Sequence, residues 1–222
     1  MTWLPIQKTS LRERDAVLGM KPDVYDVLRD MLTLTWQITD ARLLDICRLR
    51  LAQMAGARPE TAGADPQLLD DLKGWRSSPV FSDRERAAMT FAEQYHLNHH
   101  LISDEQKAAL KSHLSSREYA NFVWALHMND AFIRVLSLLD IEPDPPTDPI
   151  RPERIPPQGT QSLRIGGGDD RPPQKGAFAE VDPEFFEVYG VLGRTIVKQK
   201  LVDDVTSEAI RLHNASHQGC LY

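Results

Sequence analysis

Two helical patterns follow one another in residues 22–56, which read PDVYDVLRDMLTLTWQITDARLLDICRLRLAQMAG. Pro22 suits the first turn of a helix, and apolar side chains recur after it at helical spacing to about Gln37. Thr39 or Asp40 can cap a second helix, which would end at Gly56. The apolar faces are formed by Val24, Leu28, Met31, Leu32 and Trp36 in the first helix and by Leu43, Leu44, Cys47 and Leu51 in the second. The stretch therefore predicts two adjacent amphipathic helices.

Helical spacing continues to about residue 142. Ser82 is followed three residues later by Glu85, which is the pattern of a capping box, and the last helix should run from Arg117 to Leu139. No stretch alternates apolar and polar residues over a useful length. Further helix starts are expected at Pro66, Ser82, Ser103 and Ser116. The sequence therefore predicts an all-α domain over residues 1–142.

The composition changes after this domain. Residues 143–176 hold nine prolines and the run Gly166-Gly167-Gly168, and neither residue type sustains a helix. We expect residues 143–179 to form a linker or an ordered arm on a partner surface. Residues 180–222 again show helical spacing. Their apolar side chains, which a two-helix segment cannot cover alone, are Phe185, Phe186, Val188, Leu192 and Ile196. They should pack on the first domain or on a neighbouring chain.

The overall composition narrows the class of protein. The chain has 222 residues, is 41% hydrophobic and has a formal net charge of −6, which argues against a nucleic-acid or membrane-surface partner. No apolar run approaches the ~20 residues that a bilayer crossing needs, and the N-terminus lacks the features of a secretory signal. The two cysteines, Cys47 and Cys220, cannot form a disulfide framework. We therefore expect a cytoplasmic protein that needs no cofactor or metal.

The first two helices recur near the end of the chain. The segment from Pro22 is echoed by PEFFEVYGVLGRTIVKQ from Pro183, and the spacing Arg-Leu-x-x-Ala-x-x-x-Gly occurs at 48–56 and again at 211–219. When the two glycines are aligned, Asp45 lies opposite Glu208 and Ala57 lies opposite Cys220, with a two-residue indel between the paired helices. An internal repeat explains the shared spacing better than two unrelated hairpins do.

The second copy resembles the signature helix of the carboxymuconolactone decarboxylase / AhpD-like alkylhydroperoxidase family. In that family a helical Glu precedes a Gly-Cys-x-x-Cys turn, and a His follows on the next helix. Glu208 lies twelve residues before Cys220, which matches the family spacing. The first part is similar to the full family domain in DARLLDICRLRLAQMAG, in SPVFSDRERAAMTFAEQ and in the helix from Trp124 to Arg134. The resemblance implies that Cys220 is the outer redox thiol and that Glu208 belongs to its proton relay.

Departures from the family pattern affect both repeats. In the first repeat, the Cys-x-x-Cys positions hold Ala57 and Glu60, and the His position holds Ala64, so no thiol is present at this site. In the second repeat, the sequence stops at Tyr222, one residue before the second cysteine. A UGA codon read as selenocysteine would complete the motif, and a truncated or degenerate tail is the alternative. Reading the gene past codon 222 distinguishes them.

Three functions are therefore expected from different classes. The first is an antioxidant oxidoreductase that acts on a small peroxide or disulfide substrate through Cys220 and Glu208. A lone Cys220 could form a sulfenic acid or an intermolecular disulfide, but it could not complete an intramolecular dithiol cycle. The second is a cofactor-free lyase that resembles the family's lactone-acid decarboxylases. The third is a non-catalytic scaffold, and the resemblance implies a homo-oligomer in each case.

Other candidate residues favour structural roles. Cys47 lies on an apolar stripe and should be a packed core thiol. His96, His99 and His100 are expected at a solvated helix end, because no further metal ligands accompany them. His127 should be a satisfied core histidine.

Overall fold

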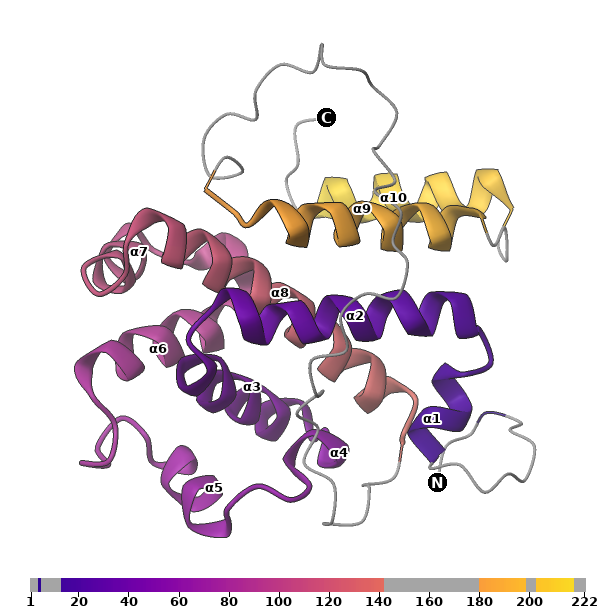
Figure 1. Ribbon diagram of the computed structural model, residues 1–222. Coiled ribbons are helices and arrows are strands. Elements are labelled where there is room, and N and C mark those ends of the chain that lie inside the picture. The colour runs from indigo at the N-terminus through magenta and orange to yellow at the C-terminus, as the bar shows by residue number, and fades with distance from the viewer. Residues whose placement is uncertain (1–3, 5–12, 142–179, 199–202, 218–222) are drawn as a thin grey trace.

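The computed structural model describes residue 4 and residues 13–141, 180–198 and 203–217, and the regular elements in these ranges are all helices (Figure 1). The prediction of an all-α fold is therefore confirmed. In chain order the elements are α1 (Glu13–Leu18), α2 (Pro22–Ile38), α3 (Ala41–Ala55), α4 (Arg58–Thr61), α5 (Pro66–Lys73), α6 (Asp83–Asn98), the 3₁₀ helix η1 (His99–Leu101), α7 (Asp104–Lys111), α8 (Ser116–Leu138), α9 (Pro183–Lys198) and α10 (Asp204–His217). None of the described helices is both long and apolar enough to cross a lipid bilayer.

Capping side chains set most of the helix boundaries. The Asp40 side chain accepts a hydrogen bond from the Leu43 backbone N–H, so Asp40 rather than Thr39 caps α3. A capping box begins α6 at Ser82, as predicted, and a second begins α7 at Ser103, where only a helix start was predicted.

The predicted cap of α8 is wrong by one residue. Ser115, and not Ser116, is the N-cap, because Glu118 lies three residues after Ser115. The Ser115 hydroxyl accepts from the Glu118 N–H, and the Glu118 carboxylate accepts from the Ser115 N–H at 2.8 Å. The two adjacent serines are distinguished only by this reciprocal pair of bonds.

The main core forms around α3, which packs against α6 and α8 (Figure 1). Cys47 is completely buried there, as expected. A second cluster joins α2, α8 and α9, and a third joins α1 to the end of α8. The largest fully buried side chains include Phe122, Phe185, Met31, Leu43, Leu44, Ile46, Leu49 and Leu51.

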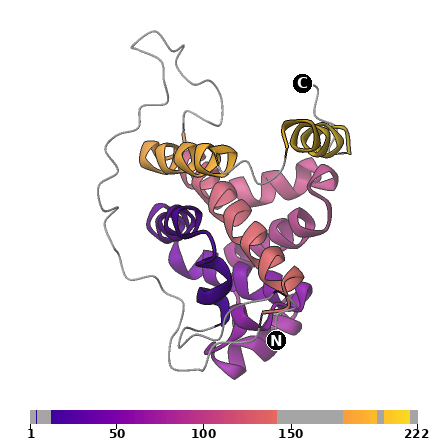
Figure 2. The same ribbon diagram turned by 90° about the vertical axis from the view of Figure 1, so that its right-hand side faces the viewer.

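Helix α9 lies along α2, as both views show (Figures 1 and 2). Asn121 on α8 donates to the Ile38 carbonyl at the end of α2 and accepts from the Asp182 N–H just before α9. The two helices are therefore antiparallel. Phe185, Val188 and Leu192 are buried against α2 and α8, as predicted for this apolar face, while Ile196 stays 54% exposed.

Helix α10 differs in burial from α3, the helix with which its sequence was aligned. Its described side chains from Asp204 to Ile210 are all exposed, and Leu212 is exposed as well. The matching residues of α3, Cys47 for Ile210 and Leu49 for Leu212, are buried. Two helices with related sequences therefore occupy unlike environments, because α3 packs against α6 and α8.

Candidate functional site

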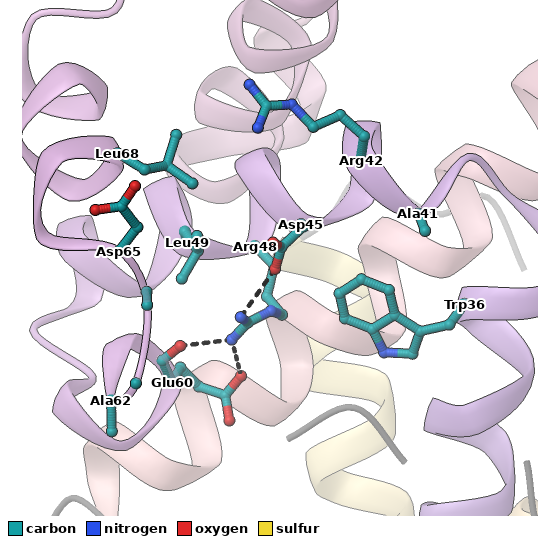
Figure 3. Close-up of a pocket in the computed structure, with 12 residues that line it drawn as sticks. Trp36, Ala41, Arg42, Asp45, Arg48, Leu49, Glu60, Ala62, Asp65 and Leu68 are labelled. Atoms are coloured by element: carbon teal, nitrogen blue, oxygen red, sulfur yellow. Dashed lines mark hydrogen bonds and ion pairs between the residues drawn. The ribbon is translucent and has the colours of Figure 1, made fainter. Parts of the chain in front are cut away.

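A cavity of about 350 Å³ lies beside α3 in the first repeat (Figure 3). Its walls come from the end of α2, from one face of α3, and from the segment that joins α4 to α5. The lining residues are Trp36, Ala41, Arg42, Asp45, Arg48, Leu49, Glu60, Ala62, Gly63, Ala64, Asp65 and Leu68. Ligand pockets commonly begin at about 300 Å³, so this cavity suits a small ligand.

Arg48 is the central side chain of this cavity. Its Nη1 donates to the Glu60 backbone oxygen at 2.6 Å and to Glu60 Oε2 at 2.7 Å, while Nη2 donates to Asp45 Oδ1 at 3.0 Å (Figure 3). Burial by itself would lower the pKa of Arg48, but the charges of Glu60 and Asp45 outweigh it and raise that pKa. The guanidinium is therefore a permanent cation that holds two carboxylates in place.

Glycine and a short helix place Glu60 beside α3. Gly56 has φ 67°, a left-handed conformation, and its N–H bonds back to the last turn of α3. The chain then reverses, with the Ala57 N–H donating to the Ala52 carbonyl at 2.9 Å, and α4 follows immediately. This reversal places Glu60 on α4 in contact with Arg48 on α3. The residue at the position that resembles the family's second cysteine is a buried carboxylate, 4% exposed.

Asp45 is the more accessible carboxylate of the pair. Its side chain is 25% exposed, compared with 4% for Glu60. Its bond to Arg48 uses Oδ1, so Oδ2 has no hydrogen bond to any described residue. The Trp36 indole forms a facing wall, and its ring centroid lies 5.8 Å from Arg48 Cζ. Asp45 can therefore accept a proton or a hydrogen bond from a molecule in the cavity.

No family model and no curated protein matches this chain. The family resemblance rests on the sequence motifs alone.

Of the two predicted redox residues, Glu208 lies within the described part of the chain and Cys220 does not. Glu208 is exposed on α10 and is not among the residues that line the cavity, and Cys220 lies outside the described residues. Cys47 is the one cysteine in the described part of the chain. It faces the core, and its burial raises the pKa of the thiol. None of the described residues that line the cavity beside α3 carries a thiol. Within the described ranges no cluster of His, Cys, Asp or Glu could hold a metal ion.

A second polar network lies between α6 and α8. His96 Nδ1 is 2.5 Å from Asp130 Oδ1, Arg134 Nε donates to Asp130 Oδ2 at 2.9 Å, and Arg134 also donates to the His96 carbonyl. Burial by itself would raise the pKa of Asp130, but the bonds from His96 and Arg134 lower it. The expectation of a solvated helix end is wrong for His96, whose side chain is 10% exposed, and correct for His99 and His100.

His127 adjoins this network, as expected for a satisfied histidine. Its Nδ1 lies 2.7 Å from the Tyr95 hydroxyl, and its ring meets Trp124 edge to face. Burial lowers the pKa of His127 and raises the pKa of Tyr95 to about 12. Both groups are therefore neutral near pH 7, and their contact is a structural link between α6 and α8.

Sequence reasoning identified Asp45 and Glu60 as acidic residues at the altered redox positions but missed Arg48. The helical spacing contains the signal, because Arg48 lies three residues after Asp45 and thus on the same face of α3. The contact with Glu60 depends on the reversal at Gly56, which spacing alone does not reveal.

Proposed function

We propose that this chain is a member of the carboxymuconolactone decarboxylase / AhpD-like family whose first repeat has a thiol-independent site. In this proposal the cavity beside α3 binds a small organic molecule and catalyses proton transfer without a cofactor, as a lyase or isomerase does. The supporting observation is that Arg48 holds both Asp45 and Glu60 at the wall of a cavity whose described lining residues include no cysteine.

Each of these groups has a distinct part in the proposed chemistry. Asp45 is the acid–base group, because its second oxygen is unoccupied among the described residues and its side chain is partly accessible. Arg48 positions Asp45, and Glu60 in turn positions Arg48 through two bonds. Asp45 would take a proton from one carbon of the substrate and return the same proton at another carbon.

Deuterium exchange tests this proposal even when the product is unidentified. The purified full chain is incubated in D₂O with a panel of small lactone acids, neutral lactones and amino ketones, and NMR follows loss of carbon-bound hydrogen. Exchange should fall at least about 100-fold in Asp45→Asn, which keeps the shape of the side chain but not its basicity. Cys220→Ser and the surface control Asp70→Asn should exchange like the wild type. Equal exchange in Asp45→Asn, or none in any protein, rejects the proposal.

We also propose a second candidate, antioxidant activity in the second repeat. It is supported by the order of α9 and α10, which repeats that of α2 and α3, with a proline at the start of α9 as of α2 and Glu208 at the position of Asp45. The Cys220 thiolate would attack the peroxide O–O bond, becoming a sulfenic acid and releasing an alcohol, with Glu208 relaying the proton to the departing oxygen.

Peroxide consumption and a sulfenic-acid probe test the second candidate. Both signals should disappear in Cys220→Ser, and peroxide consumption should be weakened in Glu208→Gln. Signals that persist in Cys220→Ser reject it. Inactivity in both assays with intact assembly would leave the scaffold function. We propose a homo-oligomer for each function, which gel filtration with light scattering measures, and a stable monomer would count against it.

A further inference from the structure

We propose that the ligand of the cavity beside α3 carries a protonated amine, that is, a small organic cation. This inference rests on the proposed function of the same cavity and concerns its substrate class. It begins with the charges in the cavity wall, where two guanidinium groups, Arg42 and Arg48, face three carboxylates, Asp45, Glu60 and Asp65.

Each guanidinium is already paired with a carboxylate, although Arg42 is bonded through Nε alone. Arg48 already binds Asp45 and Glu60, and both of its terminal nitrogens are engaged. Arg42 Nε is bonded at 3.0 Å to Glu85, which lies outside the cavity lining and adds a further negative charge beside it. With Glu85, four carboxylates oppose these two guanidinium groups, so an acid in the cavity would meet an excess of negative charge.

The carboxylates, in contrast, retain unused oxygens. Asp45 Oδ2 has no bond to any described residue, and Asp65 uses only Oδ1, which accepts the Gln67 N–H to cap α5. Figure 3 shows Asp65 with Leu68 on one side of the cavity and Trp36 on the other, with Asp45 and Arg48 between them. An ammonium group here would meet an acceptor on either of two separate elements, α3 and the start of α5.

The remaining walls suit the organic part of such a ligand. Leu49 and Leu68 offer apolar surface, and alanines at positions 41, 62 and 64 leave room for it. The Trp36 ring, which Arg48 already approaches to 5.8 Å, adds an aromatic wall on which the hydrocarbon portion can pack. Inorganic metal ions do not fit this description, because the described residues include no cluster that could ligate one. A compact amine with a hydrocarbon portion is complementary to all these walls.

Three probes with the same ring and different charge test the inference directly. Benzylammonium, benzyl alcohol and benzoate are titrated into the full wild-type chain, with calorimetry and the Trp36 indole N–H resonance, assigned from Trp36→Phe, as readouts. We expect benzylammonium to bind and shift that resonance, benzyl alcohol to bind more weakly, and benzoate not to bind. Benzoate binding as tightly as benzylammonium, or no binding of benzylammonium, overturns the inference without any variant being required.

Charge-removing variants then locate the site. Asp45→Asn and Asp65→Asn should each weaken benzylammonium binding about three- to tenfold, and Asn remains a good helix cap at position 65. Asp70→Asn removes the same charge from the exposed face of α5 and should change the affinity less than about twofold. Equal losses in all three variants would mean general charge attraction and would overturn the inference.

The binding and deuterium-exchange experiments distinguish failure of this inference from failure of the proposed function. If benzylammonium binds as described but no compound exchanges deuterium, the cation site stands and the catalytic proposal fails. If exchange occurs only with acids or neutral lactones and benzylammonium does not bind, the catalytic proposal stands and this inference fails.

Discussion

Arg48 and Glu60 are joined by two hydrogen bonds from a single nitrogen, one to the backbone oxygen and one to the carboxylate of Glu60. The pair is largely buried, with side-chain exposures of 13% and 4%. Replacing Arg48 by Met would leave Glu60 as a buried carboxylate without a counter-charge. We expect Arg48→Met to lower the free energy of unfolding by about 3 kcal/mol, measured by urea denaturation. Arg42→Met is the control, because its partly exposed pair with Glu85 should cost less than about 1 kcal/mol. Equal effects of the two substitutions would contradict a structural role for the Arg48 pair.

The hydrogen bonds of Glu93 should make its contribution to the free energy of unfolding depend on pH. It accepts from Trp75 Nε1 at 2.9 Å, from Arg50 at 2.6 Å and from Arg76. Burial alone would raise its pKa, but these hydrogen bonds lower that pKa below its ordinary 4.5. The stabilisation is therefore complete above about pH 4.5 and is lost as the pH falls through the lower folded-state pKa. We expect wild type to exceed Glu93→Gln in unfolding free energy at pH 7 and the gap to narrow below pH 4.5. A gap that is constant from pH 7 to pH 3 would rule this out.

Protonation of His127 should lower the free energy of unfolding in a pH range above that of Glu93. Burial lowers its pKa below the ordinary 6.5, so the unfolded chain takes up a proton at His127 before the folded chain does. Its contribution to stability is therefore lost as the pH falls below 6.5, by at most ~1.4 kcal/mol per pH unit. Unfolding of wild type and His127→Gln should be compared between pH 7.5 and pH 5, and wild type should lose stability more steeply. Identical slopes would show that His127 is not protected from protonation.

Phe185 should decide whether α9 stays attached to the first domain. Its ring is completely buried against α2 and α8 and contacts Trp124 at a centroid distance of 6.0 Å. Phe185→Ala should cost about 3–4 kcal/mol and expose the α9 amides to hydrogen exchange. Ile196→Ala, at the exposed end of the same helix, should change stability by less than about 0.5 kcal/mol. Slow exchange of α9 in Phe185→Ala would mean that other contacts hold the helix.

Local chemistry made much of the fold predictable from the sequence. Pro22, Ser82, Ser103 and Gly56 mark boundaries because each satisfies or removes backbone groups at a helix end. Ser115 was missed because its neighbour is also a serine and only the Glu118 spacing separates them. The apolar spacing of α9 correctly indicated a buried face, but it could not distinguish the first domain from a neighbouring chain as the covering surface.

The site was less predictable because its contacts join distant parts of the chain. Asp45 and Glu60 are fifteen positions apart, and only the turn at Gly56 lets Arg48 bridge them. His96 and Asp130 are 34 positions apart on different helices, so sequence spacing gives no sign of their contact. Such pairs depend on how helices pack against each other, and single-helix patterns do not contain that information.

Because Cys47 is completely buried, the two sulfhydryl groups of this protein can be distinguished without mutagenesis. A maleimide or a disulfide-exchange reagent added to the folded chain cannot reach a side chain with no exposed surface. Any sulfhydryl that reacts before denaturation therefore belongs to Cys220, the other cysteine in the sequence. Cys47 becomes reactive only on unfolding, so its reaction with the same reagent reports the opening of the helical core itself.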